Sequence, residues 1–136
     1  MAKKSLIVQR KVAHLDIVLS GRAEIGDAGF SKYKFIHNAL PEINFDNIDL
    51  TTTFLGKNLK APLLISCMTG GVEHGLTINR NLAETAQRLG IAMGVGSQRI
   101  GIVKPDLSSL FLARSVAPDI LLLATSGLFN LIMVLV

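Results

Sequence analysis

From Ala61 onward the chain alternates apolar runs with segments of helical spacing, and this alternation restricts the fold more than any other feature. The first run, 62–68, is almost entirely apolar, as is typical of a strand buried on both faces of a sheet. Further runs follow at 91–96 and 120–124. Strands that alternate with helices predict right-handed crossovers and a parallel sheet, so the expected fold class is α/β.

The helix expected between the first two runs has a clear apolar stripe. Thr77 is available as its N-terminal cap and Gly90 as its stop. A second, short helix is expected over 108–114. The apolar stripe consists of Ile78, Leu82, Ala83, Ala86 and Leu89.

Residues 1–60 follow no comparable period and are expected to form an N-terminal extension, distinct from the sheet-forming part at 61–124. Within the extension, the β-branched and apolar residues 50–54 precede a turn signal at 56–58 and then Leu59. This arrangement predicts a β-hairpin with a glycine-containing loop.

Composition narrows the functional class. The 136 residues are 49% hydrophobic and 18% charged, which is typical of a globular domain. Aromatic residues make up only 5%, which argues against a nucleic-acid binder that stacks bases on aromatic side chains. The net charge of +4 is compatible with an anionic partner. Cys67 is the only cysteine, so no intrachain disulfide forms, and with no secretory signal we expect a cytoplasmic protein.

Two glycine-containing turns are expected at the carboxyl ends of the first two strands, where ligands bind in parallel α/β folds. They are 68–71 and 94–99. Glycine lets backbone approach a planar or phosphorylated ligand, and Ser, Gln and Arg supply donors to oxyanions. On residue types alone, ordinary strand-to-helix turns are the simpler interpretation.

Other polar residues give weaker signals. Arg10–Lys11 with His14 could clamp a diphosphate, although a solvated basic tail is the simpler interpretation. His37 and His74 lack partners at metal-ligand spacing, so no metal site is predicted. Cys67 lies in an apolar run and is expected to be a core residue, not a nucleophile.

A series of short motifs adds a more specific signal. The motifs are Arg10–Lys11 with His14, 37–42 (HNALPE), Leu55–Gly56 leading into Ala61–Pro62, 68–71 (MTGG), Asn79–Arg80 with Leu82–Ala83, and 96–99 (GSQR). In this order they resemble the type 2 isopentenyl-diphosphate isomerases, which are flavin-dependent. The resemblance runs from about Arg10 to Ala124.

The resemblance implies a TIM (β/α)8 barrel with FMN at its C-terminal face, of which this chain supplies the extension and about the first three β/α units. It implies interconversion of isopentenyl and dimethylallyl diphosphate on reduced FMN, with Mg2+ assisting at the diphosphate and NADPH or another donor reducing the flavin. It also implies a small-molecule diphosphate as substrate, no nucleic-acid or membrane partner, and a homo-oligomer for the full-length family.

By position, the resemblance implies two sets of binding residues. Catalytic residues are expected beyond residue 136, and none is assigned here. The FMN-binding set is Cys67, Met68, Thr69, Gly70 and Ser97, and the substrate-binding set is Arg10, Lys11, Ser97, Gln98 and Arg99.

The chain departs from the family after Ala124. Codons can be chosen for Thr125 to Leu135 that, with one base added in front and regrouped, read as the family's continuation, which begins Asn-Leu-Gly-Ala-Val-Gln. We therefore expect 125–136 to be a frameshifted tail. About 250 residues make a complete barrel, so this chain is expected to be truncated and inactive, with an exposed sheet edge that promotes self-association.

Three other interpretations stay open. One is another FMN-dependent barrel, an oxidoreductase acting on a small hydroxy acid, although the Arg and Lys residues favour a diphosphate. Another is a non-catalytic barrel fragment. The last is a small membrane-anchored protein, which depends only on the apolar stretch at 120–136, a marginal span at best.

Overall fold

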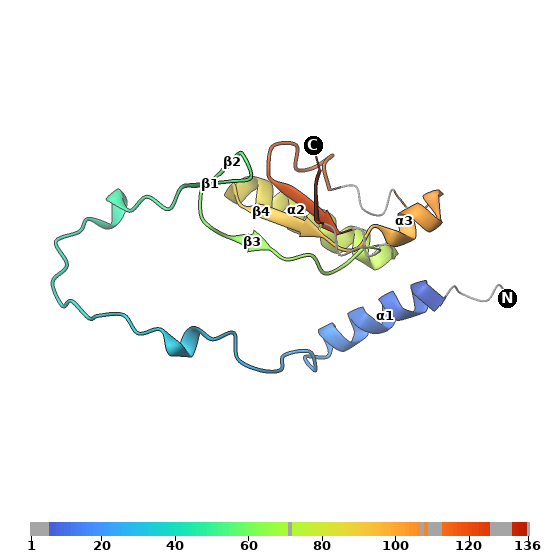
Figure 1. Cartoon of the computed structure of the whole chain (residues 1–136), viewed down its shortest axis with the longest axis horizontal. Helices are drawn as coiled ribbons and strands as arrows, with labels where there is room; N and C mark the ends of the chain where they lie inside the picture. The colour runs from blue at the N-terminus through green and yellow to red at the C-terminus, as the bar shows by residue number, and fades with distance from the viewer. Residues whose placement is uncertain (1–5, 71, 107, 109–112, 126–131, 136) are drawn as a thin grey trace.

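The computed structural model describes residues 6–70, 72–106, 108, 113–125 and 132–135 (Figure 1). Two sheets are present in this part of the chain, one of two strands and one of four. The elements in chain order are helix α1 (Leu6–Leu19), the 3-10 turns η1 (Phe30–Lys32) and η2 (Phe45–Asn47), strands β1 (Thr52–Phe54), β2 (Lys57–Leu59) and β3 (Leu64–Ile65), helix α2 (Glu73–Leu89), strand β4 (Ala92–Val95), helix α3 (Arg99–Val103), and strands β5 (Leu122–Thr125) and β6 (Ile132–Leu135).

The larger sheet has the order β3-β4-β5-β6. β3 pairs with β4 and β4 with β5 in parallel, with Leu64 opposite Ala92 and Met93 opposite Leu122. The predicted α/β class with parallel strands and a connecting helix is confirmed. The last strand, β6, runs antiparallel to β5, which the sequence pattern did not predict. The described sheet is open and does not close into a barrel.

The core lies on both faces of β4, whose four residues are all buried. Side chains alternate between the faces of a strand, so Met93 and Val95 pack toward α2 residues such as Ala86. On the other face, Ala92 packs with Leu121 and Leu123 of the next strand region and with Leu59 of β2. The hairpin therefore covers the face of the sheet that α2 leaves open.

Strand β3 is shorter and more exposed than predicted. Only two residues, Leu64 and Ile65, form the strand, and Leu63 and Leu64 are 60% and 43% exposed. The expectation of a strand buried on both faces over 62–68 was therefore wrong. The physical reason is its position: β3 is an edge strand that pairs only with β4 in the described part of the chain.

Helix α2 ends where the sequence predicts but begins earlier. Gly90 adopts a left-handed conformation with φ of 66°, and its N–H donates to the carbonyl groups of the last turn. The helix starts at Glu73 with Val72 in the cap position and no side-chain cap, so the predicted cap at Thr77 was wrong. Buried Gly75 packs against Thr69, and such tertiary packing can extend a helix past a favourable cap residue.

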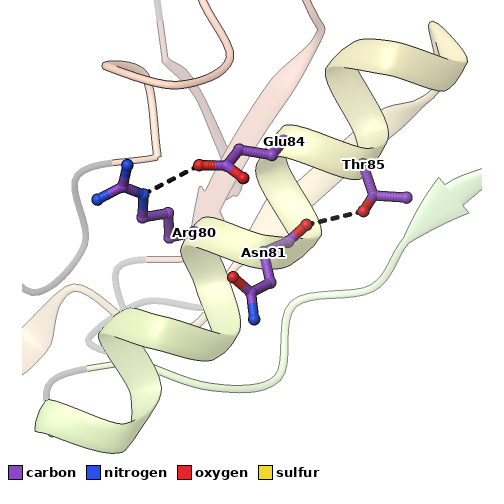
Figure 2. Close-up of polar contacts among 4 residues, drawn as sticks. All are labelled: Arg80, Asn81, Glu84 and Thr85. Atoms are coloured by element: carbon purple, nitrogen blue, oxygen red, sulfur yellow. Dashed lines mark hydrogen bonds and ion pairs between the residues drawn. The ribbon is translucent and has the colours of Figure 1, made fainter.

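On its outer face, α2 carries polar contacts between residues one turn apart. The Arg80 guanidinium lies 2.9 Å from the Glu84 carboxylate, and the Thr85 hydroxyl donates to the Asn81 carbonyl at 2.8 Å. Figure 2 shows both contacts. Because both members of the ion pair are exposed, the pair contributes little to stability. This face is solvated, whereas the opposite side of the helix carries its buried residues and packs on the rest of the chain.

The predicted hairpin is confirmed, with a correction to its turn. Leu55 and Gly56 both have positive φ, 49° and 75°, as a two-residue type I′ turn requires. Lys57 pairs with Phe54 and Asn58 with Thr53, so both residues belong to strand β2, whereas the sequence analysis placed them in the turn.

Helix α1 was not predicted, because its apolar residues do not form a clean stripe. Val8, Lys11 and Leu15 are half-buried at a spacing of three and four residues, so a lysine occupies the inner face. A cavity of about 500 Å³ lies between α1 and the start of α2, with Val12, Leu19, Val72 and Ile78 in its lining. The basic residues at 10 and 11 are therefore part of a helix that contacts the sheet-forming region, not a free tail.

Residues 20–51 form a long, mostly irregular arc that leaves the sheet (Figure 1). It includes many exposed apolar side chains: Phe35 is 100% exposed, Ile36 99% and Phe45 83%. Exposed apolar surface of this extent marks an interaction site or promotes aggregation. No helix in the described residues combines the length and hydrophobicity needed to cross a bilayer.

Replacing Phe35 and Phe45 together by serine is expected to reduce self-association, because association would bury these side chains. Sedimentation velocity should show more monomer than for the unchanged chain at equal concentration. The matched control replaces Lys34 and His37, exposed polar residues of the same arc, by serine and should leave the distribution unchanged. Equal association of both double variants would rule out the arc as the contact.

Expectations for three parts of the chain fall partly or wholly outside the described residues. The short helix expected over 108–114 lies mostly there, as does Gly71 of the first glycine turn. Of the expected frameshifted tail at 125–136, Thr125 belongs to β5 and Ile132–Leu135 forms β6. The frameshift itself concerns the gene and stays a prediction.

Candidate functional site

The carboxyl ends of β3, β4 and β5 are tied together by backbone hydrogen bonds. The Gly96 N–H donates to the Thr69 carbonyl at 2.9 Å, which joins the turn after β3 to the turn after β4. The Gln98 N–H donates to the Thr125 carbonyl at 2.8 Å, which joins the second turn to the end of β5. The two segments predicted to bind ligand therefore form one connected edge.

Lys11 reaches this edge from α1. Its Nζ donates to the Gly70 carbonyl at 2.6 Å, across 59 residues of sequence. The side chain is half-buried, and burial lowers the pKa of its ammonium group. Lys11 was assigned to the substrate and Gly70 to the flavin, and the structure brings these two residues into contact. Arg10 is exposed on the same helix.

The segment 97–99 turns directly into helix α3, a helix that was not predicted from the sequence. The Ser97 hydroxyl accepts from the Arg99 N–H at 3.3 Å, and the Gln98 side-chain amide donates to the Gly96 carbonyl at 2.9 Å. Ile100 is 1% exposed and fixes the short helix to the core. Ser97 and Gln98 are consequently half-buried and held in place, whereas Arg99 is exposed and available to an anion.

Cys67 and Met68 point to different environments. The Cys67 sulfur lies against Gly94 of β4, and burial raises the pKa of its thiol, which leaves less of the nucleophilic thiolate at neutral pH. This placement agrees with a packing role for the side chain. Met68 is 53% exposed at the edge and is free to contact a planar ligand.

Gly94 and Gly96 lie where the neighbouring strand segment leaves no room for a side chain. An ideal Cβ on Gly94 would overlap the Cys67 sulfur, and one on Gly96 would overlap the Thr69 carbonyl oxygen. The space beside both glycines is thus filled by the neighbouring strand segment. These residues permit close packing of the chain on itself, which accounts for glycine at both positions without a ligand. Ligand contact with their backbone stays a prediction.

A cavity of about 710 Å³ lies at the opposite end of the strands. Residues from the hairpin, the end of α2 and the entry to β5 line it, including Thr52, Lys60, Gln87 and Asp119. Gln87 and Asp119 bond twice: the Gln87 amide donates to the carboxylate at 2.8 Å, and the Asp119 N–H donates to the Gln87 carbonyl oxygen at 3.1 Å. None of these residues was predicted as functional, and their contacts hold α2 against β5.

Metal ligands are not gathered at the edge. Within the described ranges, no three His, Cys, Asp or Glu residues lie close enough together to hold a metal ion. His74 on α2 and His14 on α1 are exposed. The polar groups at the edge are instead donors of positive or neutral character, namely the Lys11 ammonium, the Arg99 guanidinium and the Ser97 hydroxyl. Such a set suits an anionic ligand.

Comparison with known proteins gives a consistent pattern. The family model described as FMN-dependent dehydrogenase matches residues 23–102. A protein of Rickettsia canadensis named isopentenyl-diphosphate delta-isomerase is 52% identical over 132 residues, which is 96% of this chain and 39% of that protein. Proteins of the same name from Rickettsia prowazekii and Rickettsia typhi are 52% and 54% identical, over 95% and 91% of this chain. The chain spans about two fifths of the length of these curated relatives.

Proposed function

The chain belongs to the FMN-dependent dehydrogenase family, and on that premise we propose that its site serves an isomerase that interconverts isopentenyl and dimethylallyl diphosphate. The observation that carries the proposal is the Lys11–Gly70 contact at the edge where the turns after β3 and β4 meet. It brings a cation from the extension to the end of the sheet at which parallel α/β folds bind ligands. Relatives at 52% identity with the isomerase name support the choice of reaction.

The residues at the edge fit FMN as a cofactor. Met68 offers an exposed apolar surface for a planar ring, and Thr69, Gly70 and Ser97 offer polar backbone and hydroxyl groups beside it. Cys67 is proposed to contribute through its backbone, because its sulfur packs on Gly94. Reduced FMN would supply the proton-transfer chemistry by which the double bond moves without net oxidation.

The substrate's diphosphate is proposed to lie against the cationic side chains. Lys11 and Arg99 would neutralise its charge, with Arg10 on the exposed side of α1 as a further cation. Ser97 and Gln98, which are held in place by their contacts with Arg99 and Gly96, would position the oxygen atoms. These residues bind and orient, and none of them is assigned a proton transfer.

Several further properties are proposed from the resemblance alone. They are a complete (β/α)8 barrel, Mg2+ at the diphosphate, NADPH as the flavin reductant, a cytoplasmic location and a homo-oligomer. No residue of this chain is assigned to Mg2+, since the described residues gather no set of acidic ligands. The sheet described here is open, so catalysis is proposed for the complete barrel and not for this chain by itself.

The second candidate is an FMN-dependent oxidoreductase, which the description of the matching family favours. It would act on a small hydroxy acid, for which one cation would suffice. The three cations assigned to the substrate, Arg10, Lys11 and Arg99, favour the more highly charged diphosphate. A non-catalytic role for the chain is the remaining alternative.

A chimera tests the proposal against both alternatives. Residues 1–124 of this chain would replace the matching segment of the Rickettsia canadensis relative, and the unchanged relative would serve as control. We expect the chimera to retain FMN and to interconvert the two diphosphates when the flavin is reduced. A chimera that retains FMN but instead oxidises hydroxy acids would support the second candidate. A folded chimera without flavin or activity would contradict both enzymatic functions.

A further inference from the structure

Asn79 is a buried polar residue of α2, whereas the polar residues that follow it on the helix are exposed. It is 2% exposed and is the one buried polar or charged side chain among the described residues. Arg80 and Asn81, which follow it directly, are exposed, and Figure 2 shows them on the outer face of the helix. A buried amide is costly unless it forms hydrogen bonds, so its partner indicates what it does.

The partner of Asn79 is the turn after β3. Its side-chain Nδ2 donates to the Thr69 carbonyl at 3.3 Å. The same carbonyl accepts the Gly96 N–H at 2.9 Å, so one oxygen atom joins α2, the turn after β3 and the turn after β4. Gly75, one turn earlier on the helix, packs on the same place: a Cβ there would lie 3.1 Å from the Thr69 hydroxyl oxygen.

We propose that Asn79 is a positioning residue, which holds the Thr69–Gly70 turn at the correct distance from the 96–99 turn and so preorganises the FMN site. The expected effect on FMN binding rests on the proposed function, because the two turns carry the residues proposed to bind flavin. The positioning itself rests only on the contacts of Asn79. A side chain of equal size without a donor would leave the Thr69 carbonyl with one partner fewer and let the turn shift.

The test uses Asn79→Asp, whose donor can be switched by pH. In this variant a protonated carboxyl group can donate to the Thr69 carbonyl, whereas an ionised carboxylate cannot and repels it. FMN affinity, measured by quenching of flavin fluorescence between about pH 5 and pH 8, should therefore fall about tenfold toward the upper end relative to the unchanged chain. The unchanged chain, titrated over the same range, serves as the reference. It corrects for changes in FMN affinity that come from ionisation of the flavin phosphate or of Lys11, which contacts the Gly70 carbonyl.

Asn81→Asp is the matched control, because it makes the same substitution two residues along on the exposed face of α2. Its FMN affinity should follow the unchanged chain at every pH. A pH-dependent loss in Asn79→Asp alone supports the proposal. Equal profiles for the two aspartate variants would overturn it.

A second measurement does not depend on flavin. Asn79→Ser is too short to reach Thr69, so the Gly96 amide proton should exchange with solvent about tenfold faster than in the unchanged chain. Gly96 exchange at the unchanged rate would overturn the positioning role. If the unchanged chain binds no FMN, the flavin measurement is made on the chimera with the Rickettsia canadensis relative, where loss of FMN by the unchanged chimera would contradict the proposed function, and the exchange rate of Gly96 decides the role of Asn79 by itself.

Discussion

Alanine in place of Gly94 is expected to lower the free energy of unfolding by about 3 kcal/mol, at the upper end for an overpacked core. An ideal Cβ at this position would overlap the Cys67 sulfur and lie 3.1 Å from the Cys67 backbone nitrogen. Gly94 is in the centre of β4, where all four residues are buried, so neither strand can move aside without breaking the ladder between β3 and β4. Urea unfolding followed by circular dichroism measures the change.

Cys67→Ala provides the internal control for Gly94→Ala. By itself it should cost about 1 kcal/mol, since it removes a partly exposed sulfur atom. Combined with Gly94→Ala, it should recover part of the loss, because the sulfur is the first obstacle to the new Cβ. A loss below about 1 kcal/mol for Gly94→Ala, or strict additivity in the double variant, would show that the strands are not packed as closely as described.

Replacing Lys11 by methionine is expected to weaken the binding of inorganic diphosphate about fiftyfold, the scale of a lost charged hydrogen bond. Methionine keeps an unbranched side chain of similar length and removes the ammonium group that contacts the Gly70 carbonyl. Lys57→Met is the matched control, since Lys57 is exposed on β2 of the hairpin. Isothermal titration calorimetry should find the control unchanged. Equal affinities for the unchanged chain and Lys11→Met would remove Lys11 from the proposed site.

The same lysine should give diphosphate binding a distinctive pH dependence. Burial lowers the pKa of Lys11, so the ammonium loses its proton at a lower pH than an ordinary lysine, whose pKa is 10.5. Binding of an anion needs the protonated form and should weaken as the pH rises through that lowered pKa. Lys11→Arg stays charged throughout and corrects for ionisation of the ligand. The affinity of the unchanged chain, divided by that of Lys11→Arg, should therefore fall with rising pH.

The elements that could be predicted from the sequence are those specified by local signals. Strand β4 is a short apolar run bounded by glycines. Helix α2 ends at Gly90 because the backbone there adopts a left-handed conformation, which glycine accepts without strain. Helix α1 escaped prediction because Lys11 occupies its inner face, and the contact that makes this favourable lies 59 residues away. Exposure of β3 likewise depends on its edge position, which no local pattern encodes.

The candidate site shows the same division. Residue types made the segments around Met68 and Ser97 and the basic pair Arg10–Lys11 candidates, with ordinary turns and a solvated tail as the simpler interpretations, and the resemblance assigned them to ligands. Neither indicated that Gly94 and Gly96 are required by the chain's own packing, because that conclusion needs the neighbouring strand in place. Asn79 could be singled out only as part of a motif, since its spacing on α2 does not reveal that the Thr69 carbonyl lies beside it.

The reversal of direction at β6 makes the two margins of the larger sheet unequal. β6 forms an antiparallel ladder of four residue pairs with β5, from Leu122 opposite Leu135 to Thr125 opposite Ile132. A parallel strand can therefore join β5 only by displacing that ladder, whereas the outer margin of β3 is unpaired within the described residues. For a parallel strand from another polypeptide the two margins therefore differ: such a strand can pair directly with β3, whereas pairing with β5 requires β6 to leave.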